Sequence, residues 1–391
     1  MKTKFLLPAV AGAVLLCAMP ANATVDQAKA VAGLQAMREL NLIVFQDLQS
    51  GHEVEGKAFV GGNVSGNAEN FGVGNTNQGA AANNRSILTV GGNIVANNIQ
   101  VNNGSNGNGG AHVADNVTNT ADVGANITGS LGLNVQPGHV RVGGSFNNQN
   151  FNPSSTKTVA YGQSATNLQP QDAPYVVQDP SLAAPGTGLA ATIAVQTATL
   201  QDDLTNLSNL LGGLNSLATI TGTGSALDYA GATNGVAVFT MTATAFQDSN
   251  ANFDTLFTGM PSNVVTIINV LGTNLIENGN LNTNAINQSV IWNFNQATTV
   301  SLKGFHGSVL APNAVVSNSS AIEGSIVAKL FQQNGEVHLG TFNGITPFQV
   351  PTGGGTGSVP EPATWAMMLL GFGVTGSAIR RKRREERRAA A

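Results

Sequence analysis

The hydrophobic residues of this chain occur mostly in short runs that are broken by Gly and Asn. Between residues 57 and 150, runs of β-branched residues alternate with such corners, a pattern that predicts short strands. Further strands are predicted at residues 42–45, 236–241, 263–270, 290–294 and 299–302. The chain is therefore predicted to be mainly β.

Two segments have helical spacing instead. A set of leucines at i+3 and i+4 intervals predicts an amphipathic helix over residues 200–217: Leu200, Leu204, Leu207, Leu211 and Leu214. We favour the interpretation that this helix packs along the flank of a sheet. The alternative is that it pairs with another helix in a coiled coil, but two heptads are few for a coiled coil. A weaker helix is predicted over residues 25–39, with Thr24 as its cap and Gln27 three residues later.

A five-residue pattern recurs at residues 60–64, 90–94, 123–127 and 142–146, with spacings of 30, 33 and 19 residues. Each copy places Gly-Gly-Asn, or a close variant, between apolar residues, and we expect Gly and Asn to supply positive φ in a tight bend. The pattern at residues 307–311 recurs at 324–328, an interval of 17 residues that suits one solenoid turn. Stacked coils of a β-solenoid with one continuous apolar core are therefore predicted.

The Asn- and Gly-rich segment 101–111 departs from this pattern. It is predicted to be a loop extruded from one coil, because Val and Ile on both sides favour order. A disordered low-complexity linker is the alternative. The folded body is predicted to cover residues 24–348.

Polarity comes from amides and hydroxyls, since only 10% of the residues are charged. The formal net charge of the chain is −4, but 8 basic and 19 acidic residues between Thr24 and Pro362 give that part −11. An acidic surface with few lysines argues against nucleic acid as a partner. The single cysteine, Cys17, lies in the N-terminal apolar run, so the body has no disulfide or thiol chemistry. Leu16 before it is not the small residue that a lipid-attachment site requires.

Residues 1–23 have the parts of a secretory signal peptide. Lys2 and Lys4 precede an apolar run, and Ala21 and Ala23 form the small-x-small cleavage pattern. The mature chain of an exported protein is expected to begin at Thr24; an uncleaved anchor is the alternative.

Three segments follow the body. Residues 349–362 form a Gly- and Pro-rich linker that ends in Pro360-Glu361-Pro362. Residues 363–379 carry no charge and would make a helix about 25 Å long, near the lower limit for crossing a bilayer. The tail 380–391 is basic and would stay in the cytoplasm, which places the body outside; its cluster consists of Arg380, Arg381, Lys382, Arg383 and Arg384.

This order of motif, apolar helix and basic cluster closely resembles the PEP-CTERM sorting signal of Gram-negative bacteria. The resemblance implies recognition by an exosortase-type transpeptidase, processing near Pro-Glu-Pro and removal of the helix. It also implies an inner-membrane-anchored precursor and a product in the cell envelope or matrix of a biofilm-forming, exopolysaccharide-producing bacterium. A plain membrane anchor is the alternative.

A second resemblance lies in the body. Residues 42–45 and 54–63, together with 291–294, 307–314, 323–329 and 335–338, are similar to the choice-of-anchor A family, an adhesive domain of bacterial surface proteins. The resemblance spans about residues 40–348 and implies a right-handed β-helix with a helix beside it, similar in outline to ice-binding proteins. The resemblance implies no catalytic residues. The Asn-rich insert is the main point at which this sequence differs from the family.

Motifs for chemistry are missing, so no catalytic, cofactor-binding or metal-binding residue is predicted. The five histidines have no HExxH spacing, and neither a Gly-x-Ser-x-Gly elbow nor a phosphate-binding loop is present. Segment 248–254 resembles the start of a calcium loop, but Phe253 and Gly259 stand where Gly and Glu are needed, which favours an Asn/Asp-rich turn. The closest acidic pairs for glycoside chemistry are Asp115 with Asp122 and Glu53 with Glu55.

These observations favour a structural or adhesive surface protein without enzymatic activity. Flat faces rich in Asn, Thr and Ser would bind exopolysaccharide or another surface through many weak hydrogen bonds. An extracellular polysaccharide lyase or glycosidase on the same β-helix is the alternative. Ice or crystal binding is a third hypothesis, for which a regular array of threonines is not evident.

Overall fold

A computed structural model describes residues 26–67, 69–74, 85–102, 121–134, 137–283 and 286–348. Residues up to Pro347 form one compact unit. Its strands stack as parallel coils around an apolar core, and each complete coil contributes to three faces. The predicted mainly β, solenoid-like body is confirmed.

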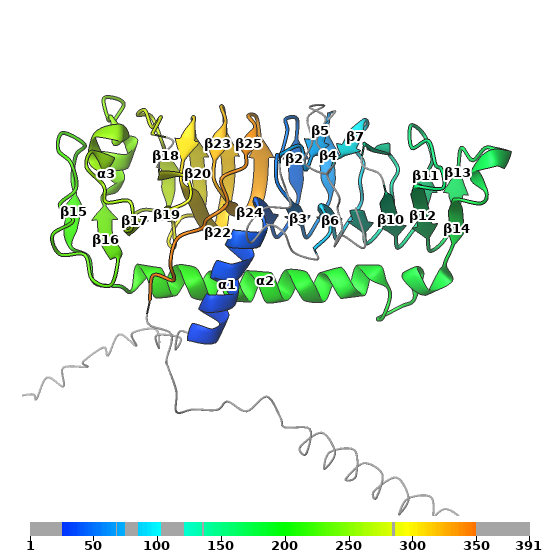
Figure 1. The fold of residues 1–391 in the computed structure, drawn as a ribbon, viewed down its shortest axis with the longest axis horizontal. Helices are drawn as coiled ribbons and strands as arrows, with labels where there is room; N and C mark the ends of the chain where they lie inside the picture. The colour runs from blue at the N-terminus through cyan, green and yellow to red at the C-terminus, as the bar shows by residue number, and fades with distance from the viewer. Residues whose placement is uncertain are drawn as a thin grey trace, which may run out of the picture. The chain divides into compact units, whose positions relative to one another are not determined.

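The first face, the helix face, carries α2 on its outer side (Figure 1). The strand pairings join thirteen strands of this face in one parallel ladder. Its strands in spatial order are β15 (Ala218–Ile220), β16 (Val236–Met241), β17 (Val265–Val270), β19 (Val290–Asn293), β22 (Ser308–Asn318), β24 (Ile326–Gln333), β1 (Leu42–Val44), β3 (Ala58–Val60), β6 (Leu88–Val90), β8 (Ala121–Val123), β10 (Gly138–Val142), β12 (Lys157–Tyr161) and β14 (Val176–Gln178). All residues of β1, β3, β6 and β17 are buried. Burial on both sides explains why these strands read as continuous hydrophobic runs.

The second face, the open face, lies away from α2, and the short helix α3 (Ala243–Gln247) contacts it at β18 (Figure 1). It consists of β18 (Asn274–Ile276), β20 (Thr299–Leu302), the second halves of β22 and β24, β2 (Leu48–Ser50), β4 (Val64–Gly66), Ile94, Ile127, β11 (Phe146–Asn147) and β13 (Ala165–Thr166).

The third face is the shortest. It consists of β21 (Phe305–His306), β23 (Ile322–Glu323), β25 (Val337–His338), Val54, β5 (Glu69–Phe71), β7 (Ile99–Val101) and β9 (Leu131–Leu133).

The two ends of the body meet in the middle of the solenoid, at a junction that we call the seam. There β24 pairs with β1 on the helix face and with β2 on the open face, while Val54 bridges β25 to β5 on the third face. From the seam the chain winds outward to β14, returns through helix α2 (Leu189–Gly212), and winds back from β15 (Figure 1). The 24 residues of α2 extend about 36 Å, roughly seven coils.

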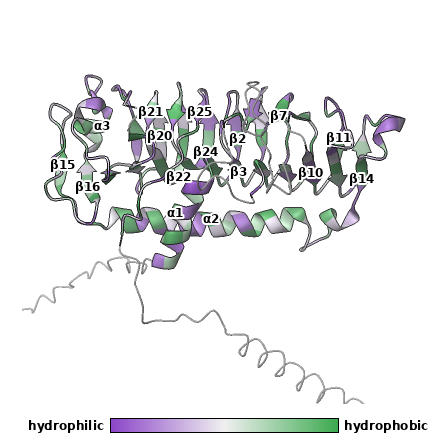
Figure 2. Cartoon of the chain, viewed as in Figure 1, coloured by the Kyte–Doolittle hydropathy of each residue, from purple (hydrophilic) through white to green (hydrophobic). Residues whose placement is uncertain are grey.

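Helix α2 packs on the solenoid through Ile193 and regularly spaced leucines, and hydrophobic and hydrophilic residues alternate along it in Figure 2. Near its C-terminal end, the buried Asn293 donates to the backbone oxygen of Ser208 at 2.9 Å and to Oδ1 of Asn269 at 2.8 Å. Helix α1 (Gln27–Glu39) crosses α2 at Gly33, where an added Cβ would lie 2.7 Å from the backbone oxygen of Asp203. A glycine is therefore needed for the two helices to approach so closely.

Short helices complete the body. Within the described residues they include α3 (Ala243–Gln247) and the 3₁₀ helices at Pro170–Asp172, Pro180–Ala183 and Phe253–Phe257. The last of these adds Phe253 and Phe257 to an aromatic cluster around the fully buried Trp292.

The structure corrects the bounds of both predicted helices. Helix α2 begins eleven residues before the predicted start and ends at Gly212, so Leu214 lies beyond it. Its first half, rich in Ala and Thr, lacks the leucine spacing that defined the prediction. Helix α1 is capped by Asp26, whose side chain accepts from the amides of Ala28 and Lys29, and the predicted cap Thr24 lies outside the described residues.

The repeats mark successive coils, as predicted. Val60, Val90, Val123 and Val142 are register partners on β3, β6, β8 and β10, and the two copies of the 17-residue repeat pair between β22 and β24. For the five-residue pattern the predicted reason for the glycines was wrong, because none of its Gly or Asn residues has positive φ, whereas Gly307 and Gly324 of the 17-residue repeat do. The requirement is space: a Cβ on Gly91 would lie 2.2 Å from the backbone oxygen of Gly61, and one on Gly92 would lie 2.5 Å from Oδ1 of Asn63.

Within the described residues, no helix is both long and apolar enough to cross a membrane. The predicted spanning helix 363–379 lies outside them, and so do the cleavage residues Ala21 and Ala23, the sorting residues from Pro360 to Arg384, and most of the insert 101–111.

Candidate binding surfaces

A ladder of amides lies where the helix face turns into the open face. Oδ1 of Asn63 accepts from the backbone and side-chain nitrogens of Asn93 at 2.8 and 3.0 Å, and Oδ1 of Asn93 accepts the same pair from Asn126 at 3.0 Å. Asp47 begins the ladder by accepting from Asn63, and Ser145 continues it by donating to Asn126. Each amide thus fixes the spacing to the next coil and leaves a regular polar edge beside the open face.

The open face presents one outward position per coil in a straight column. The register pairings align ten of these positions: Ile276, Ser301, Ser317, Gln332, Gln49, Ser65, Val95, Thr128, Asn147 and Thr166. None of them is charged, and most are hydroxyl or amide residues. At the usual spacing between strands the column extends about 43 Å. The residue before each of these positions is buried, except the partly buried Ala165, so the column is backed by the apolar core.

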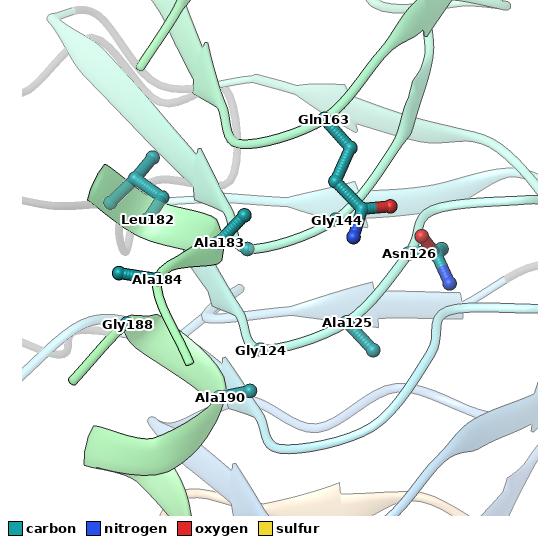
Figure 3. Close-up of a pocket in the computed structure, with 11 residues that line it drawn as sticks. Gly124, Ala125, Asn126, Gly144, Gln163, Leu182, Ala183, Ala184, Gly188 and Ala190 are labelled. Carbon is teal, nitrogen blue, oxygen red and sulfur yellow. The ribbon is translucent and has the colours of Figure 1, made fainter. Parts of the chain in front are cut away.

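A groove lies between the corner glycines and the start of α2 (Figure 3). Its volume is about 240 Å³. One wall is built by Leu182, Ala183 and Ala190, and the opposite side by Asn126 and Gln163, which lie two coils apart with Gly144 between them. Backbone and small side chains form most of its surface, and none of the residues that line it is charged.

The third face carries a row of ionisable side chains at the seam. His306, Glu323 and His338 are register partners, and Glu55 of the N-terminal half follows next to His338. The imidazole of His338 pairs with Glu323 through Nδ1 and with Glu336 through Nε2 at 2.7 Å. Burial opposes the charged form of His338, but hydrogen bonds to Glu336 and Glu323 prevail and raise its pKa to about 8.

We expect this row to make the body less stable in alkaline solution. Since the pKa of His338 is higher in the folded chain than the ordinary 6.5, its contribution is complete below pH 6.5 and is lost as the pH rises through 8. After allowance for solvent screening the loss is about 1 kcal/mol. Urea unfolding at pH 6 and pH 9 should show this difference, and His338→Gln should remove it.

The matched control is His52→Gln, which changes an exposed histidine. Lys57 has the opposite effect on the pH dependence of stability, because burial lowers its pKa to about 8. The parent and the variant must therefore be compared at each pH. An equal pH dependence in the parent and in His338→Gln would contradict the prediction.

The acidic pairs considered for catalysis have structural contacts. Asp122 is bound by Arg141 at 2.7 and 2.9 Å, while its sequence neighbour Asp115 lies outside the described residues. Glu53 accepts from Asn70 at 3.1 Å, and Glu55 accepts from the backbone amide of Leu339 at 2.6 Å. Among the residues that the structure describes, no three His, Cys, Asp or Glu side chains are placed to hold a metal ion.

The calcium-like segment is a turn. Asp248 accepts from the amide of Asn250, and Asn252 accepts from the amide of Asp254. Asp254 in turn accepts from the amide of Asn282 and the hydroxyl of Thr283, both at 2.7 Å. These oxygens are directed at the chain itself.

Two features were not predicted from the sequence, namely the coil that begins at Tyr161 and the ladder of amides. Tyr161 is the register partner of Val142, so residues 161–165 form a fifth copy of the repeat with Tyr in the first place and Gln in the third. The interval of 19 residues from Val142 was the signal that could have found it. The ladder could have been suspected from the Asn at the fourth place of three copies.

The fold is thus a parallel β-solenoid flanked by a long helix, with an uncharged face of regular spacing. Its sequence matches the family model described as "Putative Ice-binding-like adhesive domain" over residues 33–132 and 116–339, and the chain belongs to this family. Residues 358–384 match the PEP-CTERM protein-sorting motif, a range that includes Pro360, Glu361, Pro362 and the arginine cluster. The chain is therefore an exported surface protein of the Gram-negative envelope that is processed by an exosortase-type system.

Among solved structures, the chain is similar to an ice binding protein from an Antarctic bacterium of the Flavobacteriaceae. The identity is 13%, the alignment covers 83% of this chain and 86% of that chain, and the TM-score is 0.21. No curated protein matches the sequence.

Proposed function

We propose that the mature protein is a non-enzymatic adhesive component of the biofilm matrix, which binds exopolysaccharide through its open face. The observation that carries the proposal is the column of ten uncharged positions in register. Amide and hydroxyl groups repeated at about 4.8 Å suit a long ligand whose own hydroxyl groups repeat.

The physical argument is one of many weak contacts. A single neutral hydrogen bond in water contributes only about 1 kcal/mol, so one sugar unit would bind poorly. Contacts on several coils to one polymer act together, because after the first contact the others form within one complex. The rigid, ladder-fixed spacing reduces the ordering cost of such binding.

We expect retention of the producer's exopolysaccharide to depend on the column. Thr128→Glu combined with Ser317→Glu places two charges on the open face, and retention in a pull-down with the purified mature protein should fall roughly tenfold. The matched control is Ala198→Glu with Gln201→Glu, which adds the same charge to the exposed side of α2. Equal retention by the two double variants would refute the role of the open face.

The same samples test for enzymatic activity. The proposal expects no release of reducing ends and no unsaturated products from the retained polymer over prolonged incubation. Release that a single Asp or Glu substitution abolishes would instead establish a lyase or glycosidase.

A further inference from the structure

The parallel ladder of the helix face stops at two end strands, β14 and β15, which lie at opposite ends of the solenoid (Figure 1). β14 pairs with β12 alone and β15 pairs with β16 alone, whereas each of the other strands in this ladder has a neighbour on both sides. Within the described residues, one edge of each end strand therefore has no strand beside it.

The free edge of β14 carries backbone groups that are directed away from the body. In a parallel ladder, a residue directs both its N–H and its C=O to the same neighbouring strand, and the direction alternates from one residue to the next. The amide of Asp179 donates to the backbone oxygen of Tyr161 on β12 at 2.8 Å. Val177 therefore also bonds to β12, and the backbone groups of Val176 and Gln178 are directed outward.

The free edge of β15 carries the groups that complement them. The backbone oxygen of Ile220 accepts from the amide of Thr242 at 3.0 Å, so Ile220 bonds to the β16 side and the backbone groups of Thr219 are directed outward. In a second copy, the N–H of Thr219 can donate to the oxygen of Val176, and its oxygen can accept from the N–H of Gln178. This pairing places Thr219 opposite Val177.

The register of the whole ladder leads to the same pairing. Register partners followed strand by strand from Val177 pass through Arg141, Ile43 and Asn293 and end at Thr219. A second copy placed as the next coils of the same solenoid would thus bring its Thr219 opposite Val177, with no sideways shift. Strand direction, hydrogen-bonding groups and register all agree at this junction.

The side chains of the two end strands do not oppose such a contact. None of the six residues of β14 and β15 is charged, although charged side chains are a common protection of free strand edges. Val177 is 54% exposed, and the exposed Leu168 and Leu217 lie in the same end coils. A second copy would remove part of this apolar surface from water.

We propose that β14 of one copy pairs with β15 of a second copy, so that the protein associates head to tail into filaments. A second copy is the partner because the two edges that complement each other belong to the same chain. A head-to-tail contact that continues the solenoid axis does not close on itself, and therefore it repeats. The inference does not depend on the ligand of the open face.

The first test uses the full-length protein in mild detergent. Sedimentation velocity should show oligomers that grow with protein concentration, and electron microscopy should show single-file rods. Since the body carries a formal charge of −11, copies repel each other, and association should strengthen as salt screens this charge. A single protomer at every concentration and salt, or pairs that lie side by side, would overturn the proposal.

A charge exchange tests the pairing of the two positions. Neighbouring strands lie about 4.8 Å apart, so side chains at positions 177 and 219 would be direct neighbours across the junction. Val177→Lys with Thr219→Lys places like charges there and should weaken association about fivefold. Val177→Lys with Thr219→Glu places opposite charges there and should restore association to at least the parent level. Equal association by the two double variants would overturn the proposal.

The matched control is Val195→Lys with Ala198→Lys, which adds the same charge as the double lysine variant on the exposed side of α2. Its association should equal that of the parent or exceed it, because the added charge reduces the repulsion between copies. Circular dichroism melting identifies the variants that fold like the parent, and only these are compared. A fivefold loss in this folded control would also overturn the proposal, since the end strands would then have no special role.

Discussion

Replacing Asn41 with alanine is expected to destabilise the body by about 3–5 kcal/mol. The amide of this fully buried residue donates to the backbone oxygens of Gly324 at 2.8 Å and His338 at 3.0 Å, and its oxygen accepts from the amide of Gly56 at 2.9 Å. These three partners come from both sides of the seam. The variant leaves two buried groups and one half-buried group without this bond, at about 1–3 kcal/mol per buried group. Urea unfolding followed by far-UV circular dichroism measures the change.

The control for this variant is Asn334→Ala. Asn334 is exposed, and its side chain makes one bond, of 3.3 Å, to a nearby backbone oxygen. A loss below about 0.5 kcal/mol is expected there. If both asparagine variants unfolded at the same urea concentration, Asn41 would have no special role at the seam.

Gly91→Ala is expected to cost about 2–3 kcal/mol, although it adds a single methyl group. The new Cβ would lie 2.2 Å from the backbone oxygen of Gly61 and 3.3 Å from Cγ2 of Ile193 on α2. Neither the adjacent coil nor the helix can move alone, so the strain spreads through the stack. Thermal melting of the purified protein should show a clear decrease.

Gly222→Ala provides the comparison. A Cβ at this exposed position meets no atom within 4 Å, and its φ is not in the left-handed region. Its melting temperature should equal or slightly exceed that of the parent, since alanine restricts the unfolded chain. A parent-like Gly91→Ala protein would show that the stacking of coils is looser than the structure indicates.

The coils could be predicted because they are marked by patterns among residues that are close in the sequence. The repeated Val-Gly-Gly-Asn sequence placed β3, β6, β8 and β10, and hydrophobic runs placed β16 and β17, because both signals depend on neighbouring residues. The start of α2 was missed for the same reason. Its Ala- and Thr-rich half is held by contact with corner glycines of other coils, which no helical spacing records.

The binding features depend on distant residues and could not be predicted. The seam joins Leu42 to Ile326, and the register partners Phe59, Thr89, Asp122 and Arg141 come from four coils of the helix face. Long and unequal loops between coils hide this alignment in the sequence. The prediction of positive φ for the glycines of the five-residue pattern was wrong, because a glycine can be required by crowding as well as by backbone angle.

The central place of β1 has a consequence for secretion. The first strand to leave the translocation channel has partners on both sides, and one of them, β24, leaves almost last. Until then the strand keeps an unsatisfied, strongly apolar edge, which invites misassembly with other emerging chains. A prematurely terminated chain would retain that edge permanently, so envelope proteases should remove such fragments far faster than the intact product.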